Sequence, residues 1–328
     1  MTKLRLSIGV SDYDRVKALK EGLVQVEGCD PVVVALQQPE AVFHTAYTHQ
    51  EFDVCELSFS STILQTARGN CPYVPIPVFL SRVFRHSGIY VRADSGITKP
   101  EDLKGKIVGV PEYQMTAALW IRGMLSDEYG VKASDIKWRN GGLENPGREE
   151  KFGLQPPGVE LKAIPHDRTL NDMLDTGELQ AVITARAPSC FDGVKVVRLF
   201  KDYKKAEQAY YAKTKLFPIM HVIGVRRTLL DQYPWVAASL VKAFTESKAR
   251  TVEKFKDVTA LFVTMPWIGA ELAETIALMG EDFWPYGVEA NRHTVEAMTR
   301  YSFEQGLSPR KVSVDELFAP STYETVKI

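Results

Sequence analysis

Strand and helix signals alternate from the start of the chain, and this alternation limits the fold more than any other feature. Short apolar runs rich in β-branched residues are separated by segments with helical polarity. Such alternation is typical of a parallel sheet covered by helices. The predicted strands of this first unit are LRLSIGV, PVVVAL, FDVCELS, YVPIPVF and FRHSGIYVR.

A second unit of the same kind begins near Lys99. It contains the strand KIVGV, the amphipathic helix TAALWIRGMLSDEYGV and, over residues 140–158, a long polar loop of the kind that is more often functional than idle. After the strand FPIMHVIGV the chain is mainly helical. We therefore predict an α/β protein with two lobes around a central cleft. Residues 1–92 and 217–328 would form the first lobe, including the C-terminal helices, and residues 93–216 the second.

The bulk composition fits a globular protein that binds a small molecule. Of the 328 residues 45% are hydrophobic and 25% charged, and the formal net charge is −1 with a pI of about 6.6. No basic segment suggests nucleic-acid binding, and no run approaches the roughly 20 apolar residues of a membrane helix. The four cysteines form no C-x-x-C pair, and the N-terminal MTKLRLSIGV lacks a secretion-signal pattern. We therefore expect a cytoplasmic protein without nucleic-acid or membrane partners; homo-oligomerisation is left open.

Polar side chains gather where the predicted strands end. They are Glu56, Ser58 and Ser60 in the first unit and Glu112, Tyr113 and Thr116 in the second. Ligands of open parallel sheets bind at the carboxyl ends of the strands, and helix N-termini attract anions. Two such helix starts facing each other across a cleft suit a small dianion. The alternative is that these Ser and Thr residues only cap helices.

The stretch SRVFRHSGIYVR brings two arginines and a histidine to the mouth of an apolar strand. Arginine presents a planar fork that matches a carboxylate. In a regular strand Arg82 and His86 share one face, and Arg85 reaches the ligand only if the strand is kinked or begins later. Surface charges are the alternative, although the apolar neighbours indicate burial. Two further candidates are Arg186, after the strand AVITA, and His221, which closes FPIMH and is otherwise a hydrogen-bonded core residue.

No established catalytic or nucleotide motif is present. The sequence contains no G-x-G-x-x-G, no Walker loop and no nucleophile elbow. Glu56, His86 and His221 are residue types that bind metals, but no spacing argument supports a site. We therefore predict no metal site from the residues alone.

Five long segments are more specific than any short motif: HQEFDVCELSFSS, IPVFLSRVFRHSGIYVR, DLKGKIVGVPEYQMTAALWIRG, FPIMH and MGEDFWPYGVEANRHT. Through them the chain resembles the 4,5-dihydroxyphthalate decarboxylase family nearly from end to end. The resemblance implies the two-lobed type II fold of periplasmic binding proteins. It also implies a non-oxidative decarboxylation that yields 3,4-dihydroxybenzoate and CO2. No organic cofactor is expected, and a divalent metal is left open.

For such a reaction the residues suggest roles. The candidates for substrate binding are Arg82, Arg85 and Arg186, with hydrogen bonds from Ser58, Ser60, Tyr113 and Thr116. His86 or His221 is the candidate proton donor to the ring carbon, and Glu56 or Glu112 the candidate acceptor of the hydroxyl proton. Two other functions fit the same features. One is the substrate-binding protein of a transporter for a small carboxylate, which requires export; the other is a different lyase on the same fold.

Overall fold

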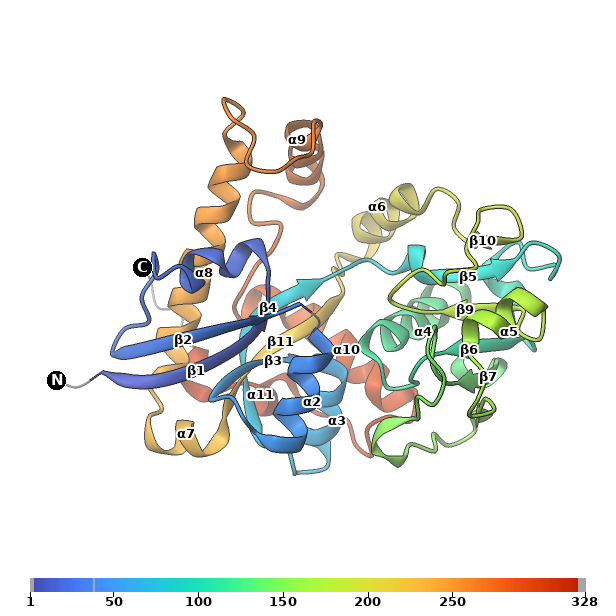
Figure 1. Cartoon of the computed structure of the whole chain (residues 1–328), viewed down its shortest axis with the longest axis horizontal. Coiled ribbons are helices and arrows are strands. Elements are labelled where there is room, and N and C mark those ends of the chain that lie inside the picture. Colours follow the sequence, from blue (N-terminus) through green and yellow to red (C-terminus); the bar gives the residue numbers. More distant parts are fainter. Residues whose placement is uncertain (1–2, 38, 324–328) are drawn as a thin grey trace.

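The computed structural model describes residues 3–37 and 39–323, and these form two lobes, each built on its own sheet (Figure 1). The strands are β1 (Leu4–Ser11), β2 (Cys29–Leu36), β3 (Val54–Ser58), β4 (Tyr73–Arg82), β5 (Ile89–Arg92), β6 (Ile107–Val110), β7 (Lys137–Asn140), β8 (Leu161–Ala163), β9 (Ala181–Ile183), β10 (Val196–Arg198) and β11 (Ile219–Arg226). The helices are α1 (Lys17–Lys20), α2 (Pro39–His49), α3 (Phe59–Ala67), α4 (Thr116–Tyr129), α5 (Leu170–Thr176), α6 (Tyr203–Thr214), α7 (Arg227–Gln232), α8 (Val236–Lys256), α9 (Ile268–Met279), α10 (Arg292–Glu304) and α11 (Val314–Leu317). Within the two described ranges, no helix is long and apolar enough to cross a membrane. The predicted two-lobed α/β class is confirmed.

The first sheet has the strand order β2-β1-β3-β11-β4. β1 pairs in parallel with β2 and β3, whereas β11 returns from the other lobe and runs antiparallel between β3 and β4. This insertion places His221 opposite Ser58 on one side and opposite Ser81 on the other. The central strands are apolar because both faces are covered, and every residue of β3 except Ser58 is buried.

The second sheet has the order β10-β5-β9-β6-β7-β8. β6, β7, β8 and β9 are parallel, and β5 pairs antiparallel with β9 and β10. Residues 111–115 connect the carboxyl end of β6 to the N-terminus of α4, and the contact between Thr116 and Ser58 places this turn against the first lobe.

The predicted strand FRHSGIYVR is wrong over its first half. β4 ends at Arg82, a 3₁₀ turn covers His86–Gly88, and only then does β5 begin in the second sheet. Gly88 permits the tight crossing, because a Cβ there would lie 2.7 Å from the carbonyl oxygen of Thr184. The expected lobe boundary after residue 92 therefore falls on the wrong side of β5.

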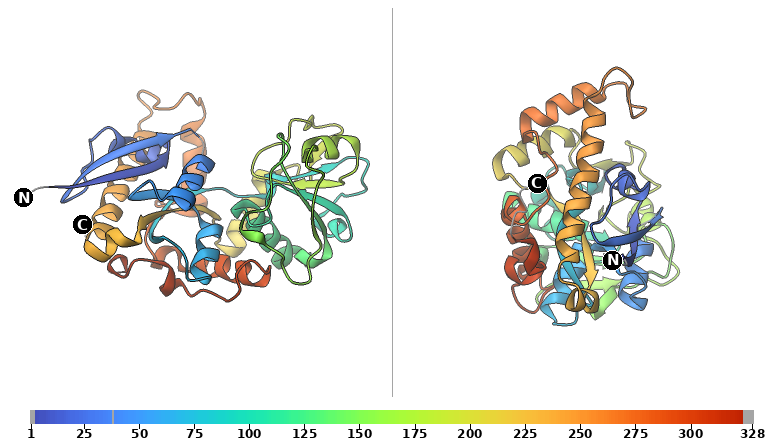
Figure 2. Two further views of the ribbon diagram at one scale, coloured as in Figure 1. Left: turned by 60° about the horizontal axis from the view of Figure 1, so that its bottom comes forward. Right: turned by 90° about the vertical axis from the view of Figure 1, so that its left-hand side faces the viewer.

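The C-terminal helices do not all belong to the first lobe. In Figure 2 the C-terminal segment runs beneath both lobes, and α10 packs against α3 of the first and α4 of the second. The ring of Tyr301 lies against Gly123 of α4, where a side chain would leave no room, and Arg300 pairs with Asp127 at 2.5 Å. α10 thus fastens the two lobes together.

Candidate active site

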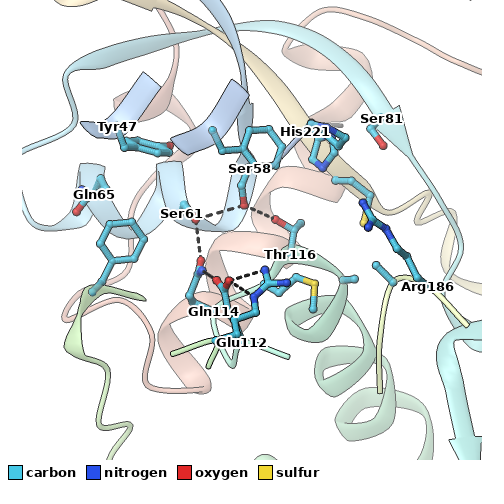
Figure 3. Close-up of a pocket in the computed structure, with 18 of the residues that line it drawn as sticks. Tyr47, Ser58, Ser61, Gln65, Ser81, Glu112, Gln114, Thr116, Arg186 and His221 are labelled. Atoms are coloured by element: carbon cyan, nitrogen blue, oxygen red, sulfur yellow. Dashed lines mark hydrogen bonds and ion pairs between the residues drawn. The ribbon is translucent and has the colours of Figure 1, made fainter. Parts of the chain in front are cut away.

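A cavity of about 650 Å³ lies between the two lobes, where β3 and β6 end (Figure 3). Its wall contains residues of the first lobe, residues of the second and Arg85 from the crossing segment. Tyr47 and Gln65 lie on one side of the view in Figure 3, and His221 and Arg186 on the other. A cleft between two sheets, lined by residues that follow strand ends, is a common place for a ligand site.

Glu56 and His221 form a hydrogen-bonded pair at this wall. Nδ1 of His221 lies 2.6 Å from Oε1 of the fully buried Glu56. The same carboxylate accepts hydrogen bonds from the Ser11 amide (2.9 Å), the Ser11 hydroxyl (2.7 Å) and the Tyr13 hydroxyl (2.7 Å). The pair therefore fixes the ring so that Nε2 is the nitrogen left for a ligand.

The charges of this network follow from its contacts. Burial alone would raise the pKa of Glu56, but the His221 ring and the hydrogen bonds outweigh it, so the pKa lies below its ordinary value. Burial, and next the Glu56 charge, raise the pKa of Tyr13, which therefore stays protonated as a donor. Glu56 is an ionised anchor behind His221 and does not line the cavity.

A chain of hydroxyl contacts crosses the cleft. Ser58 Oγ lies 3.0 Å from Thr116 Oγ1, the Ser60 amide donates to the same Thr116 oxygen at 3.2 Å, and Ser61 Oγ donates to Gln114 Oε1 at 2.7 Å. Ser58, Ser60 and Ser61 belong to the first lobe, whereas Gln114 and Thr116 belong to the second. These contacts close the floor of the cavity beneath any ligand (Figure 3).

Glu112 and Arg148 form the acidic and basic pair of the second lobe. Arg148 reaches Glu112 Oε1 with Nε at 2.6 Å and Nη2 at 2.5 Å, and the Gln114 amide donates to the other carboxylate oxygen. Glu112 is almost completely buried, and both charged residues line the cavity.

Arg85 and Arg186 supply further positive charge. Arg85 donates from Nε to the Met220 sulfur at 3.2 Å, and burial lowers its pKa to about 10, which leaves it protonated at neutral pH. Arg186 lines the same cavity. The described lining residues thus include three arginines, Arg148 among them, and one carboxylate, that of Glu112. This excess of positive charge suits a ligand that is a dianion.

Arg82 is not in the cavity, contrary to its predicted role. As the last residue of β4 it pairs with Ile219, and its guanidinium turns toward the C-terminal segment. It donates to the Pro285 carbonyl and to the Asn291 side chain. Burial lowers its pKa to about 9. Arg82 therefore anchors residues 285–291 to the sheet.

His86, Tyr113 and Ser60 also lie away from the cavity wall. His86 packs edge-on between Phe200 and Tyr210, and burial lowers its pKa to about 4. Tyr113 is fully buried and donates to the Gln305 carbonyl. The Ser60 hydroxyl is buried without a hydrogen-bond partner among the described residues. The expectation that Arg82 and His86 share the ligand face is therefore wrong, because the strand ends at Arg82 and the chain turns. Of the three residues, Arg85 is the one that lines the cavity.

Several lining residues received no role from the sequence, and the main ones are Tyr13, Tyr47, Ser61, Gln114, Arg148 and Phe152. Arg148 and Phe152 come from the long polar loop, whose length was the one signal that marked it. Tyr13 follows the end of the first strand, the same kind of position as Ser58. Within residues 3–37 and 39–323, no group of three or more His, Cys, Asp or Glu side chains is placed to hold a metal ion.

The fold and the cavity define a protein of the two-lobed binding-protein type, whose cleft is lined by arginines and by a histidine hydrogen-bonded to a buried glutamate. Its fold is similar to that of the periplasmic aliphatic sulphonate binding protein SsuA from Escherichia coli, with a TM-score of 0.55, 16% identity and coverage of 98% of this chain and 99% of that one. A putative sulfonate-binding SsuA from Methylobacillus flagellatus gives a TM-score of 0.54 at 15% identity, with 98% and 93% coverage. These likenesses concern the fold alone.

The sequence comparisons identify the family. Residues 9–145 match the NMT1/THI5-like family model. The chain is 50% identical over 331 residues, the whole of both chains, to 4,5-dihydroxyphthalate decarboxylase from Comamonas testosteroni. It is 49% identical over 214 residues to the enzyme of that name from Pseudomonas putida, with 64% of this chain and 83% of the relative covered. The chain belongs to the 4,5-dihydroxyphthalate decarboxylase family, as its sequence segments predicted.

Proposed function

We propose that this protein converts 4,5-dihydroxyphthalate to 3,4-dihydroxybenzoate and CO2 in the cavity between its lobes. The observation that carries this proposal is the 50% identity, over both entire chains, to a curated decarboxylase of that name. A cavity with three arginines and a histidine held by a buried carboxylate supports it, because the reaction needs charge recognition and proton transfer.

The chemistry of the substrate defines what the cavity must provide. Each carboxylate of 4,5-dihydroxyphthalate is para to one hydroxyl. If the ring carbon that bears the carboxylate gains a proton and the para hydroxyl loses one, a dienone results. Breaking the bond to the carboxylate then returns an electron pair to the ring, releases CO2 and regenerates the hydroxyl on reprotonation. The site must therefore hold an acid near one ring carbon and a base at the opposite end of the ring.

His221 is the proposed acid. Its Nδ1–H donates to Glu56, and a proton on Nε2 is then directed to a ligand in the cavity. Glu56 acts as a positioning residue, since it already accepts three hydrogen bonds from Ser11 and Tyr13 and lies behind the ring. His86, the other candidate from the sequence, is packed elsewhere between aromatic rings.

Arg85 and Arg186 are proposed to hold the carboxylate that stays on the ring. Firm anchoring of the departing carboxylate would stabilise the ground state and slow the reaction. That group should therefore lie beside Phe43, whose ring meets His221 edge-on at 4.8 Å, and away from the two arginines that hold the other carboxylate.

Three further expectations accompany the proposal. No organic cofactor is expected, because the ring itself accepts the electron pair. A cytoplasmic location also remains a prediction, and the oligomeric state, left open by the sequence, is to be measured by light scattering.

The direct test is product analysis. Purified, chelator-treated protein is incubated with 4,5-dihydroxyphthalate, with and without added divalent metal, and CO2 and 3,4-dihydroxybenzoate are quantified. The proposal predicts one molecule of each product for every substrate consumed. Unchanged substrate under both conditions would overturn it, and tight binding without turnover would favour a binding protein instead.

A further inference from the structure

The part of the cavity formed by the second lobe, away from His221 in Figure 3, carries the Glu112–Arg148 ion pair. Glu112 is the one carboxylate among the described lining residues, and it follows β6 of the second sheet, whereas His221 lies on β11 of the first. Donor contacts from the Arg148 guanidinium and the Gln114 amide orient it. An acid and a carboxylate on opposing lobes match a substrate whose reacting carbon and para hydroxyl lie at opposite ends of a ring.

The loop that carries Arg148 is fixed in place by Glu150, two residues further along the chain. Glu150 accepts the backbone N–H groups of Tyr113 (2.5 Å) and Gln114 (3.2 Å), immediately before α4. The Glu150 contacts tie the loop to the same turn that holds Glu112. Arg148 is therefore presented to Glu112 by a docked loop rather than by a freely moving side chain.

The same loop also reaches the first lobe. The Phe152 carbonyl accepts from the Arg68 guanidinium at 3.3 Å, and the Phe152 ring meets Tyr47 edge-on at 6.3 Å. Because Phe152 and Tyr47 both line the cavity, the loop closes this end and separates Glu112 from solvent. Only 2% of the Glu112 surface is exposed.

We propose that Glu112 binds the ring hydroxyl of the substrate and takes its proton, with Arg148 as the residue that positions it. This inference rests on the proposed function and adds the basis of its specificity: the Glu112–Arg148 pair selects hydroxylated dicarboxylates from those without hydroxyls. In the step, the hydroxyl O–H bond breaks and the proton passes to a Glu112 oxygen. His221 loses its proton to the ring carbon, the bond to the carboxylate then breaks with release of CO2, and its electron pair restores the aromatic ring. The phenolate oxygen that results takes the proton back from Glu112.

A carboxylate is a sufficient base for this step. A free phenolic hydroxyl, with an ordinary pKa near 10, would hold its proton against a carboxylate. Once the para carbon is protonated, however, positive charge reaches the hydroxyl oxygen and makes it strongly acidic. Proton transfer to Glu112 therefore becomes favourable only as His221 delivers its proton, so the two transfers support each other.

The test uses two probes that do not require turnover. Phthalate carries both carboxylates and no hydroxyl, whereas 3,4-dihydroxybenzoate carries both hydroxyls. Binding of each is measured by calorimetry to the full-length wild type and to Glu112→Gln, Arg148→Gln and Arg148→Lys. Glu149→Gln, an exposed residue between Arg148 and Glu150, is the matched control.

Glu112→Gln should weaken the binding of 3,4-dihydroxybenzoate by at least about tenfold, which is the effect of losing a hydrogen bond to a charged group. The binding of phthalate should stay nearly unchanged. Arg148→Gln should follow the same selective pattern, and Arg148→Lys should recover part of it. Equal weakening of both probes, or no weakening of either, would overturn the inference. Selective weakening in a protein that shows no turnover would uphold hydroxyl recognition and reject the decarboxylase proposal, so the two failures are distinguishable.

Discussion

Replacing His221 by Gln should slow decarboxylation without unfolding the protein. The imidazole is 2.6 Å from Glu56, and its side chain is 16% exposed toward the cavity. If the ring is removed, Glu56 keeps its hydrogen bonds from the Ser11 amide and hydroxyl and from Tyr13. The buried carboxylate therefore keeps hydrogen-bond donors, and the protein should stay folded although the loss of the ring lowers its stability.

The size of the effect follows from the role assigned to the ring. A positioned proton-transfer group contributes about 10²–10⁴ in rate, which corresponds to about 2.7–5.4 kcal/mol at about 1.36 kcal/mol per factor of ten. We expect kcat to fall by that range. Binding of 3,4-dihydroxybenzoate should change by less than about tenfold, because the arginines and Glu112 remain.

His86→Gln is the matched control, since it removes the same kind of side chain from the 3₁₀ turn just before β5. His86 packs against Phe200 and Tyr210 outside the cavity. Its variant should lose stability and keep kcat within about a factor of three. Turnover is followed by the release of 3,4-dihydroxybenzoate, and folding by circular dichroism. Wild-type kcat in His221→Gln, or an equal loss in both variants, would refute the assignment.

Three other predictions come from single contacts. Arg85→Gln should raise KM by about 10–100-fold through loss of a charge-assisted hydrogen bond, whereas Arg82→Gln should lower Tm with KM unchanged; steady-state kinetics and thermal melts separate the two. Burial raises the pKa of Glu150 from 4.5 to about 7, so the folded state holds this proton more tightly than the unfolded chain. Stability should therefore fall as pH rises from about 4.5 to about 7, and denaturant titrations of Glu150→Gln should lack that part of the slope. Gly123→Ala should cost about 1–3 kcal/mol in chemical denaturation, because a Cβ would overlap the Tyr301 ring; an unchanged midpoint would contradict the packing described for α10.

The fold was largely predictable because its signals are local. Apolar runs alternating with helical segments mark the strands of both sheets, and the polar residues at their ends, such as Ser58, Glu112 and Thr116, meet in the cavity. Parallel topology explains this success, since it brings successive strand ends to one edge.

The errors arose where a strand ends or a loop returns from a distance. Side-chain alternation assigned Arg82 and His86 to the ligand face, but alternation applies only inside a strand, and β4 stops at Arg82. The crossing that follows brings Arg85 to the cavity instead. Arg148 could not be placed because its contact with Glu112 depends on the docking of a loop 36 residues away in the chain. No local pattern encodes such a contact.

The central claim is tested most directly by following the reaction in D2O by NMR. The account predicts that 4,5-dihydroxyphthalate disappears with the appearance of 3,4-dihydroxybenzoate that carries one deuteron, at the ring carbon ortho to the remaining carboxylate. A substrate spectrum that stays unchanged with and without divalent metal, or a product that retains both carboxylates, would contradict it.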